Sequence, residues 1–498
     1  MVSMRTAVVG VLTALALAGC SSSSSGSGPT ITSFTATPST VPTGGGSVTL
    51  AWVVTGATTL SIDQGVGSVS PVTSGSATAQ VTATTTFTLT ATNSGGSSTS
   101  TAQVTVQAPI TVAGTVVDRN GAIAAGESVL ITSGTFSANT VSGADGTFSI
   151  AHVPTPYTAT VLDSGGQIAV QYVGLTRTDP SLVDLITVPQ TRSSMVAGNL
   201  TGGQFPESGE YDTTLRFFSP QTTLQSSAGL SVATDGTFSG GVVWLGPTET
   251  TGTLYALQIH TPGLLPTDYP GYGTLPNVLL QDMGSISGKT IPMSPVTSGT
   301  LSGTVTMPAG FSVEENDLYL VVAPDQVILT VGDSMPTTSF SYTAPSISGT
   351  SLTMLTTVDG AALGAAIVTT TGLTASSTGV AVNVPSPSNL TLPVDSATGV
   401  TTTTPFSWTD STAVYVVAFS STSGPTYYVF TAATTATIPD LSAAGLPLPT
   451  STSYSWQVLG FGPNTSVDAA AIPGGIVGLE LTDGYIGESP TRSFTTGP

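Results

Sequence analysis

Apolar residues alternate with serine and threonine along most of this chain, and that two-residue period constrains the fold more than any other feature. Near the amino terminus, Val48, Leu50 and Trp52 share one face of an extended segment, as do Phe87 and Leu89. A period of two is typical of β-strands with one buried face. Glycine- and proline-rich turns separate these segments, and no stretch shows a capped 3.6-residue period. The pattern predicts an all-β protein, a tandem array of β-sandwich domains.

The first residues have the composition of an export signal. Arg5 precedes an apolar run over residues 7–18, which is shorter than the about 20 residues that span a bilayer. The run ends at Leu17-Ala18-Gly19-Cys20, which resembles the lipobox of bacterial lipoproteins. The resemblance implies a signal peptide over residues 1–19 and acylation of Cys20, the only cysteine, followed by a Ser/Gly tether to residue 28.

This resemblance implies a location and one partner. The protein is expected in the bacterial cell envelope, held at a membrane by the lipid on Cys20. Ser21 follows the cysteine, which in lipoproteins favours the outer membrane where the organism has one. The alternative is cleavage by the general signal peptidase, which would leave Cys20 near the new terminus as a free thiol.

Composition excludes several classes of protein. The chain has 498 residues, too many for one core, and a hydrophobic fraction of 39%, too high for a disordered chain. Its 27 acids outnumber 7 bases, for a net charge of −20. Phosphate binding needs clustered bases, so a nucleic-acid partner is excluded. With Cys20 committed to lipid there are no disulfides.

Three segments resemble known domain families. Residues 29–108, with SVTLAWVV around Trp52, resemble bacterial immunoglobulin-like domains, and the resemblance implies that Trp52 lies in the core of a sandwich. Residues 109–190, with GTVVDRNG and then DGTFSI, resemble carboxypeptidase regulatory-like domains, transthyretin-like sandwiches that carry no catalytic residues. Residues 389–498, with FSW, YSWQV and RSFTT, resemble fibronectin type III domains, and Trp408 and Trp456 would then face each other across the core.

An internal repeat fills the region between these segments. VAGNLT around Gly198 and LSGTVT around Gly303 lie 105 residues apart, and acids and leucines follow each at matching offsets. A period of that length is a whole domain, because solenoid and propeller repeats run about 20 to 50 residues. The repeat predicts two sister β domains at 191–297 and 298–388. We expect five domains with separate cores, joined by short proline-bearing connections into an extended string.

Residues able to catalyse a reaction are scarce. The two histidines, His152 and His260, fall in different expected domains, and no nucleophile motif accompanies either. No metalloprotease motif, Walker loop or dinucleotide fingerprint is present. The sequence therefore predicts a protein that is not an enzyme and that uses no cofactor.

Acidic residues at matching places in the sister domains form the one polar constellation. Two carboxylates offset by two on a strand point to one face, and such oxygens can hold Ca²⁺. A calcium site needs six or more oxygens, so we favour the alternative of a solvated segment that blunts a sheet edge. The calcium candidates are Glu207, Glu210 and Asp212 in the first sister domain, and Glu314, Glu315 and Asp317 in the second.

The features together predict a lipid-anchored, non-catalytic structural or adhesive protein of the cell envelope. One alternative is a carbohydrate- or peptide-binding lipoprotein, which would group exposed aromatics such as Tyr269, Tyr272, Tyr427 and Tyr428 on one face. Another is an anchored hydrolase within the sister domains, which would show buried carboxylates converging in a pocket.

Overall fold

The computed structural model describes residues 26–118, 121–163, 165–185, 191–206, 208–222, 224–226, 230–263, 265–322, 327–332, 336–409, 411–475 and 483–498. The expected signal peptide, Cys20 and Glu207 lie outside these ranges. In the described part, strands β1 to β40 are accompanied by two 3-10 turns and one four-residue α-helix, so the prediction of an all-β fold is confirmed. None of the described helices is long and apolar enough to cross a membrane. The chain divides into two compact units, Met1–Ala108 and Pro109–Pro498.

The amino-terminal unit is a two-sheet sandwich, in keeping with its alternating sequence. Trp52 is only 2% exposed and packs with Leu50 and Phe87 between the sheets, while its indole nitrogen donates to the carbonyl oxygen of Pro71 at 3.0 Å. The assignment of Trp52 to the core is confirmed. One sheet has the order β1-β3-β6 (Thr30–Thr37, Gly46–Thr55, Ser74–Val81) and the other β2-β8-β7-β4-β5 (Thr40–Val41, Gly96–Val106, Thr85–Asn93, Thr59–Ile62, Gly67–Val69).

Residues 109–185, here called sandwich I, form a seven-stranded sandwich. A tight turn lies at Asp145-Gly146, a dipeptide that favours such turns: Gly146 has φ +74°, and the Asp145 carboxylate accepts bonds from the backbone nitrogen and hydroxyl of Thr147. The first sheet has the order β12-β9-β15 (Thr147–Val153, Ile110–Asp118, Ser181–Asp184), and the second β11-β10-β13-β14 (Phe136–Val141, Ser128–Ser133, Tyr157–Leu162, Ile168–Leu175).

Residues 191–297 and 298–384, here sandwiches II and III, follow the strand plan of sandwich I. In each of the three, the first strand pairs antiparallel with one neighbour and parallel with a strand near the end of the sandwich, which is β15 in sandwich I, β23 in sandwich II and β31 in sandwich III. The strands of sandwich II are β16 (Arg192–Thr201), β17 (Tyr211–Phe218), β18 (Leu224–Ser226), β19 (Ser231–Val232), β20 (Thr237–Leu245), β21 (Glu249–His260), β22 (Asp268–Gln281), β23 (Gly284–Pro292) and β24 (Ser294–Val296). Those of sandwich III are β25 (Ser298–Thr306), β26 (Ser312–Val322), β27 (Val327–Gly332), β28 (Ser339–Pro345), β29 (Thr350–Asp359), β30 (Ala365–Leu373) and β31 (Val380–Asn383).

A cross-strand glycine–phenylalanine pair recurs at the centre of each plan. The glycine lies on the first strand, and the phenylalanine ring of the antiparallel neighbour lies over it, so that a built Cβ would sit 2.5 to 2.7 Å from the ring. Such an approach leaves room only for glycine. The pairs are Gly114 with Phe148, Gly198 with Phe238, and Gly303 with Phe340. The chain therefore contains three copies of one sandwich, where the sequence predicted a pair of sister domains.

Residues 389–498 form the C-terminal domain. Phe406, Trp408 and Trp456 are buried in one apolar cluster, with the Phe406 and Trp456 ring centroids 4.9 Å apart. One sheet has the order β32-β34-β37 (Leu390–Leu392, Phe406–Trp408, Thr435–Ala436), and the other β36-β35-β38-β39 (Thr426–Thr431, Val414–Ser420, Ser453–Gly462, Gly484–Glu488), with β40 (Arg492–Thr496) paired to β38 and β33 (Ala397–Val400) paired to β40.

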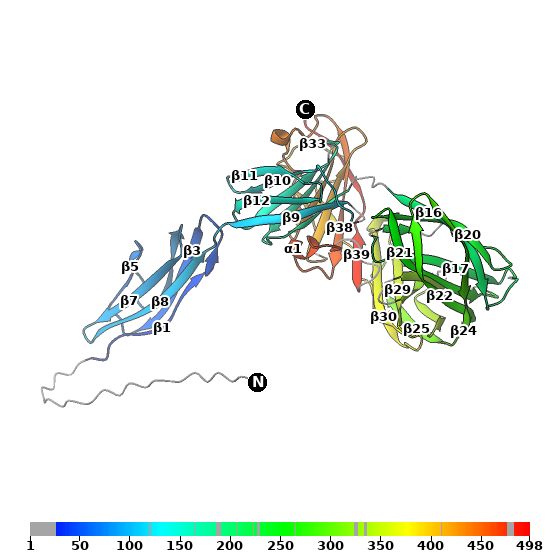
Figure 1. The fold of residues 1–498 in the computed structure, drawn as a ribbon. Helices are drawn as coiled ribbons and strands as arrows, with labels where there is room; N and C mark the ends of the chain where they lie inside the picture. Colours follow the sequence, from blue (N-terminus) through cyan, green and yellow to red (C-terminus); the bar gives the residue numbers. More distant parts are fainter. Residues whose placement is uncertain are drawn as a thin grey trace, which may run out of the picture. The chain divides into compact units, whose positions relative to one another are not determined.

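The second sheet of the C-terminal domain joins two sandwiches into a 14-stranded sheet (Figure 1). Strand β36 pairs in parallel with β14 of sandwich I, and β39 pairs antiparallel with β30 of sandwich III. Apolar clusters are shared as well. The expectation of separate cores is therefore wrong for residues 109–498, because backbone bonds at strand edges and apolar side chains connect domains far apart in sequence.

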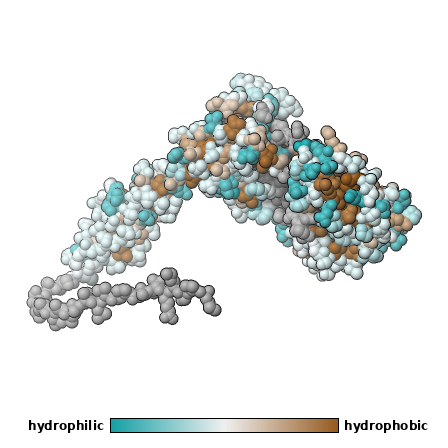
Figure 2. Space-filling model, viewed as in Figure 1, coloured by the Kyte–Doolittle hydropathy of each residue, from teal (hydrophilic) through white to brown (hydrophobic). Residues whose placement is uncertain are grey.

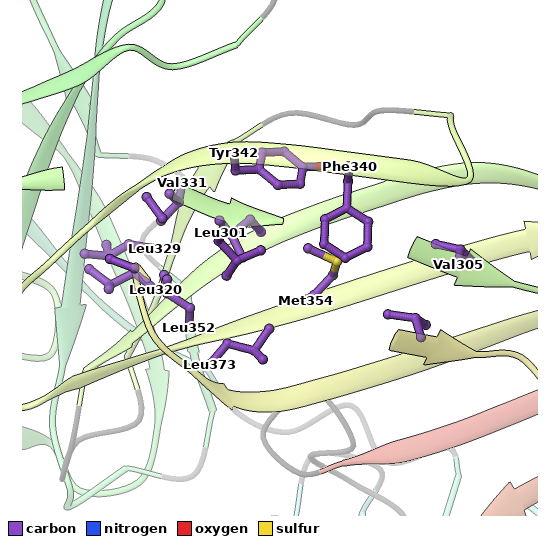
Figure 3. Close-up of a cluster of buried hydrophobic side chains, with 14 of the residues drawn as sticks. Leu301, Val305, Leu320, Leu329, Val331, Phe340, Tyr342, Leu352, Met354 and Leu373 are labelled. Carbon is purple, nitrogen blue, oxygen red and sulfur yellow. The ribbon is translucent and has the colours of Figure 1, made fainter. Parts of the chain in front are cut away.

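Sandwiches II and III also share a core. Tyr255, Leu257 and Tyr269 of sandwich II belong to the same buried cluster as the interior of sandwich III, and the Tyr269 hydroxyl donates to the carbonyl oxygen of Thr343 at 2.6 Å. Figure 3 shows the sandwich III part of this cluster, where the Phe340 ring lies beside Met354.

Candidate functional site

A polar pocket lies at one end of sandwich II. Its cavity of about 290 Å³ is bounded by the start of β17, the loop between β21 and β22, and β27 of sandwich III. Two of the predicted acids, Glu210 and Asp212, line it on either side of Tyr211. The described lining residues are Gly209, Glu210, Tyr211, Asp212, Thr214, Ile259, Thr261, Gly263, Pro266, Thr330 and Val331.

His260 lies beside this pocket at the end of β21. Its Nδ1 is 2.7 Å from the Asp268 carboxylate, its Nε2 is 3.5 Å from Glu210, and its ring stacks on Tyr211 with centroids 4.4 Å apart. The hydrogen bond to Asp268 raises the pKa of His260 above its usual value, with Glu210 adding to the effect and partial desolvation opposing it. The sequence did not connect His260 to the acids, because β17 and β21 are neighbours only through the sheet.

This arrangement is suited to holding the loop between β21 and β22 closed. The backbone nitrogens of Thr261 and Thr267 donate to the carbonyls of Glu210 and His260, at 2.7 and 2.9 Å, so main-chain bonds fasten the same segment that the imidazole fastens. Among the described lining residues there is no serine or cysteine to act as a nucleophile. The Thr267 hydroxyl also lies 3.3 Å from the His260 Nδ1, so the imidazole contacts this loop through two neighbouring side chains, Thr267 and Asp268.

The acids of sandwich III do not reproduce this site. Glu314 and Glu315 are exposed on β26, and the Tyr319 hydroxyl donates to Asp317 at 3.1 Å. Asn316, between Glu315 and Asp317 in the sequence, is fully buried, and its side-chain oxygen accepts a bond from the Thr356 hydroxyl at 2.9 Å. Within the described ranges, no three His, Cys, Asp or Glu side chains are placed to hold a metal ion. Whether calcium binds here stays a prediction.

The four tyrosines proposed for a ligand-binding face are not grouped on the surface. Tyr269 and Tyr427 are 1% and 0% exposed, and their burial raises both pKa values, that of Tyr427 to about 12. Tyr272 and Tyr428 are half-buried and pack against apolar clusters. Tyr427 and Tyr428 are adjacent on β36 and point to opposite faces, and both faces are covered, one by the core of the C-terminal domain and the other by the cluster shared with sandwich I.

The buried carboxylates that a hydrolase would need lie elsewhere, in sandwich I. Asp163 accepts bonds from the backbone nitrogens of Gly165, Gln167 and Ile168, so it closes a hairpin. Asp118 accepts a bond from Ala122 at 2.9 Å and closes another turn. Sequence reasoning missed these acids, although aspartate beside a turn is a recognisable signal. The other buried acids of sandwich I are Glu127 and Asp184.

His152 is separate from every acid discussed above. It is exposed on β12 and has φ +58°, in keeping with the interpretation of a strand-end histidine.

Comparisons with known proteins give only distant likenesses. No protein-family model matches the chain, and no curated protein sequence matches it. The Bacillus anthracis TIE protein aligns over 72% of this chain and 74% of its own, at 9% identity and a TM-score of 0.17. A Ca²⁺-stabilised, ice-binding adhesin of an Antarctic bacterium aligns over 70% and 99%, at 15% identity and 0.14. A tetra-tandem repeat from the extending region of a large adhesion protein aligns over 78% and 99%, at 14% identity and 0.15. Scores this low support no conclusion about function.

Proposed function

We propose that this chain is an exported, lipid-anchored structural or adhesive protein of the cell envelope and that it catalyses no reaction. The observation that carries the proposal is the 14-stranded sheet, which uses edge strands of the C-terminal domain to fasten sandwiches I and III together. Edge strands and apolar side chains are used here for cohesion, and the one histidine–carboxylate constellation of the described part fastens a loop.

The surface supports a role in which the protein is exposed to solvent. Figure 2 shows a face that is mostly pale, neither strongly hydrophilic nor strongly hydrophobic, as expected when serine and threonine supply the polarity. Cationic partners remain compatible with the net charge of −20, and polyanions are repelled. The lipobox resemblance at Cys20 supplies the proposed anchor.

Cell fractionation tests the anchor. Cys20→Ser should move the protein from the membrane to the soluble fraction, because no second acylation site exists in a chain with one cysteine. Ser23→Ala, in the tether, is the matched control and should stay with the membrane. A Cys20→Ser protein that remains fully membrane-bound would refute the anchor.

The structural or adhesive role is tested in the same strains. Cells with the anchored protein should resist detachment from a surface or envelope stress better than cells without it, and cells with the released Cys20→Ser protein should behave like the deletion. Full function of the released protein would contradict a role that depends on attachment.

A peptide- or glycan-binding role is the second candidate, and the cavity beside Tyr211 favours it. Its volume is close to the lower end of the range for ligand pockets, about 300 Å³. Tyr211→Ala should abolish binding to a peptide or glycan array if the cavity is the site, whereas Tyr319→Ala in sandwich III should not.

A further inference from the structure

The C-terminal domain carries one loop that is long for a fibronectin type III-like domain. It leaves β38 at Gly462 and returns at Gly484, and its described part includes α1 (Val467–Ala470). Ser466 caps this short helix by accepting a bond from the backbone nitrogen of Ala469. Two aspartates of the loop, Asp468 and Asp483, point outward to other domains.

Asp468 binds sandwich I just beyond the end of β14. Its carboxylate accepts bonds from the backbone nitrogen of Thr176 at 2.9 Å, from the Thr176 hydroxyl, and from the backbone nitrogen of Arg177 at 3.3 Å. The Arg177 guanidinium donates in turn to the carbonyl oxygen of Asp468 at 2.9 Å. Ser181 adds a backbone bond to Ala471 at 2.8 Å. These bonds give the polar segment that follows Gly174 its partner in the C-terminal domain.

Asp483 makes the matching contact with sandwich III. Its carboxylate accepts bonds from the backbone nitrogen of Thr371 at 2.6 Å and from the Thr371 hydroxyl at 3.0 Å. Thr371 lies near the end of β30, the strand that corresponds to β14. Both strands end in the same Gly-Leu-Thr sequence, with a glycine at positive φ: Gly174 at +85° and Gly372 at +67°.

Strand pairing reinforces each aspartate. On the sandwich I side, five residues of β36 align with β14, beginning at Ile168 opposite Thr426, and the rings of Tyr172 and Phe430 stack with centroids 4.4 Å apart. On the sandwich III side, five residues of β39 pair with β30. The C-terminal domain therefore binds sandwiches I and III through corresponding strands, β14 in parallel and β30 antiparallel, and through an aspartate that accepts bonds from a threonine near the end of each strand.

We infer that the C-terminal domain is a clasp that closes residues 109–498 into a ring of domains. Asp468 and Asp483 are its two side-chain contacts, to sandwich I and to sandwich III. A pull between the two ends of the chain then passes from sandwich I directly into the C-terminal domain across β14 and β36. Sandwiches II and III, whose residues lie between these strands in sequence, bear no load until that junction opens. The clasp deepens the proposed structural or adhesive role and rests on it, because only an attached protein is pulled.

Disulfide trapping tests whether the junction is closed in solution. In the full chain with Cys20→Ser, the pair Ile168→Cys and Thr426→Cys should form a disulfide readily, because neighbouring strands lie about 4.8 Å apart and disulfides span Cα distances of about 4.4 to 6.8 Å. The pair Ile168→Cys and Met283→Cys is the control and should not, although Met283 is 92% exposed. Failure of the first pair to oxidise in the folded protein would overturn the clasp.

Single-molecule pulling from the two termini tests the path of the load. When the trapped pair is oxidised, the junction cannot open and sandwiches II and III bear no load. The unfolding events that disappear from the force traces on oxidation are therefore those of sandwiches II and III. In the reduced chain they should always follow one earlier event, the opening of the junction. Asp468→Ala with Asp483→Ala should shorten the lifetime of that junction about tenfold or more at constant force, because bonds to a charged acceptor are lost.

Two further variants keep the pulling result interpretable. Asp440→Ala is the matched control, since the Asp440 carboxylate binds only within its own domain, to Ser442, and it should leave the junction unchanged. Thr176→Val removes a single hydroxyl bond and serves as the test if the double variant misfolds. It should shorten the lifetime of the junction less than the double variant does. Unfolding of sandwiches II and III without a preceding event, or unchanged lifetimes in the double variant, would refute the clasp while leaving the Cys20 anchor untouched.

Discussion

Gly303 is a position where the addition of a single methyl group should be strongly destabilising. It lies on β25, between the antiparallel strand β28 and the parallel strand β31. In Gly303→Ala the new Cβ would lie 2.5 Å from the Phe340 ring, and it would also overlap the carbonyl oxygen of Val380. The ring is the end of a side chain that can rotate, but the carbonyl belongs to a paired strand and cannot move alone.

The expected cost follows from these two neighbours. Inserting a methylene into a packed core costs about 1–3 kcal/mol, and a clash with backbone lies at the upper end, so we expect about 3 kcal/mol. Phe340→Leu in the same chain should restore part of this, because it relieves the ring and leaves the carbonyl. Gly209→Ala, with no atom within 4 Å of the built Cβ, is the control and should be near neutral.

Hydrogen exchange is the appropriate assay, because a chain of several domains does not unfold in two states. Amides of β25, β28 and β31 should lose protection in Gly303→Ala by about two decades, the equivalent of about 3 kcal/mol, whereas strands of the amino-terminal unit should not change. A loss below about 0.5 kcal/mol would show that the close approach is relieved by a small shift, and it would refute the glycine–phenylalanine pair as the basis of the threefold plan.

Three other predictions address separate parts of the chain. Trp52→Ala should destabilise the amino-terminal unit by about 3–5 kcal/mol in hydrogen exchange, whereas Val53→Ala, on the exposed face, should cost little. Chelation of calcium should move the midpoint of thermal unfolding by no more than about one degree. A calcium ion bound at 100 times its Kd would add about 2.7 kcal/mol of stability, so a large downward shift would contradict this prediction. Because the pKa of His260 is raised in the folded protein, protonation of His260 stabilises the folded state. This stabilisation is fully present below the unfolded-state pKa of 6.5 and is lost as the pH rises through the folded-state pKa. The melting temperature of the native protein should therefore fall relative to His260→Gln over that rise, and parallel curves would contradict it.

Some residues could be interpreted correctly without a structure. Trp52 sits on an alternating face and is buried, and Asp145-Gly146 is the turn that the dipeptide predicts. The repeat of Gly198 and Gly303 was visible as well. Its third copy was present in the sequence too, since the Asp-Gly-Thr-Phe of sandwich I recurs at 235–238 in sandwich II. That local motif marks the third copy, because the acidic residues that follow Gly198 and Gly303 have no counterpart at matching offsets after Gly114.

The sequence alone determined the strands, because alternation, turn residues and the need to bury one face act over a few neighbouring residues. It could not determine which strand edges meet, because any edge strand offers the same row of backbone donors and acceptors and carries no sequence label for its partner. Only the tertiary structure decided that β36 pairs with β14 and β39 with β30, that Asp468 meets Thr176 across 292 residues of chain, and that His260 lies between Glu210 and Asp268. These contacts join segments far apart in the chain, and they depend on how whole domains pack.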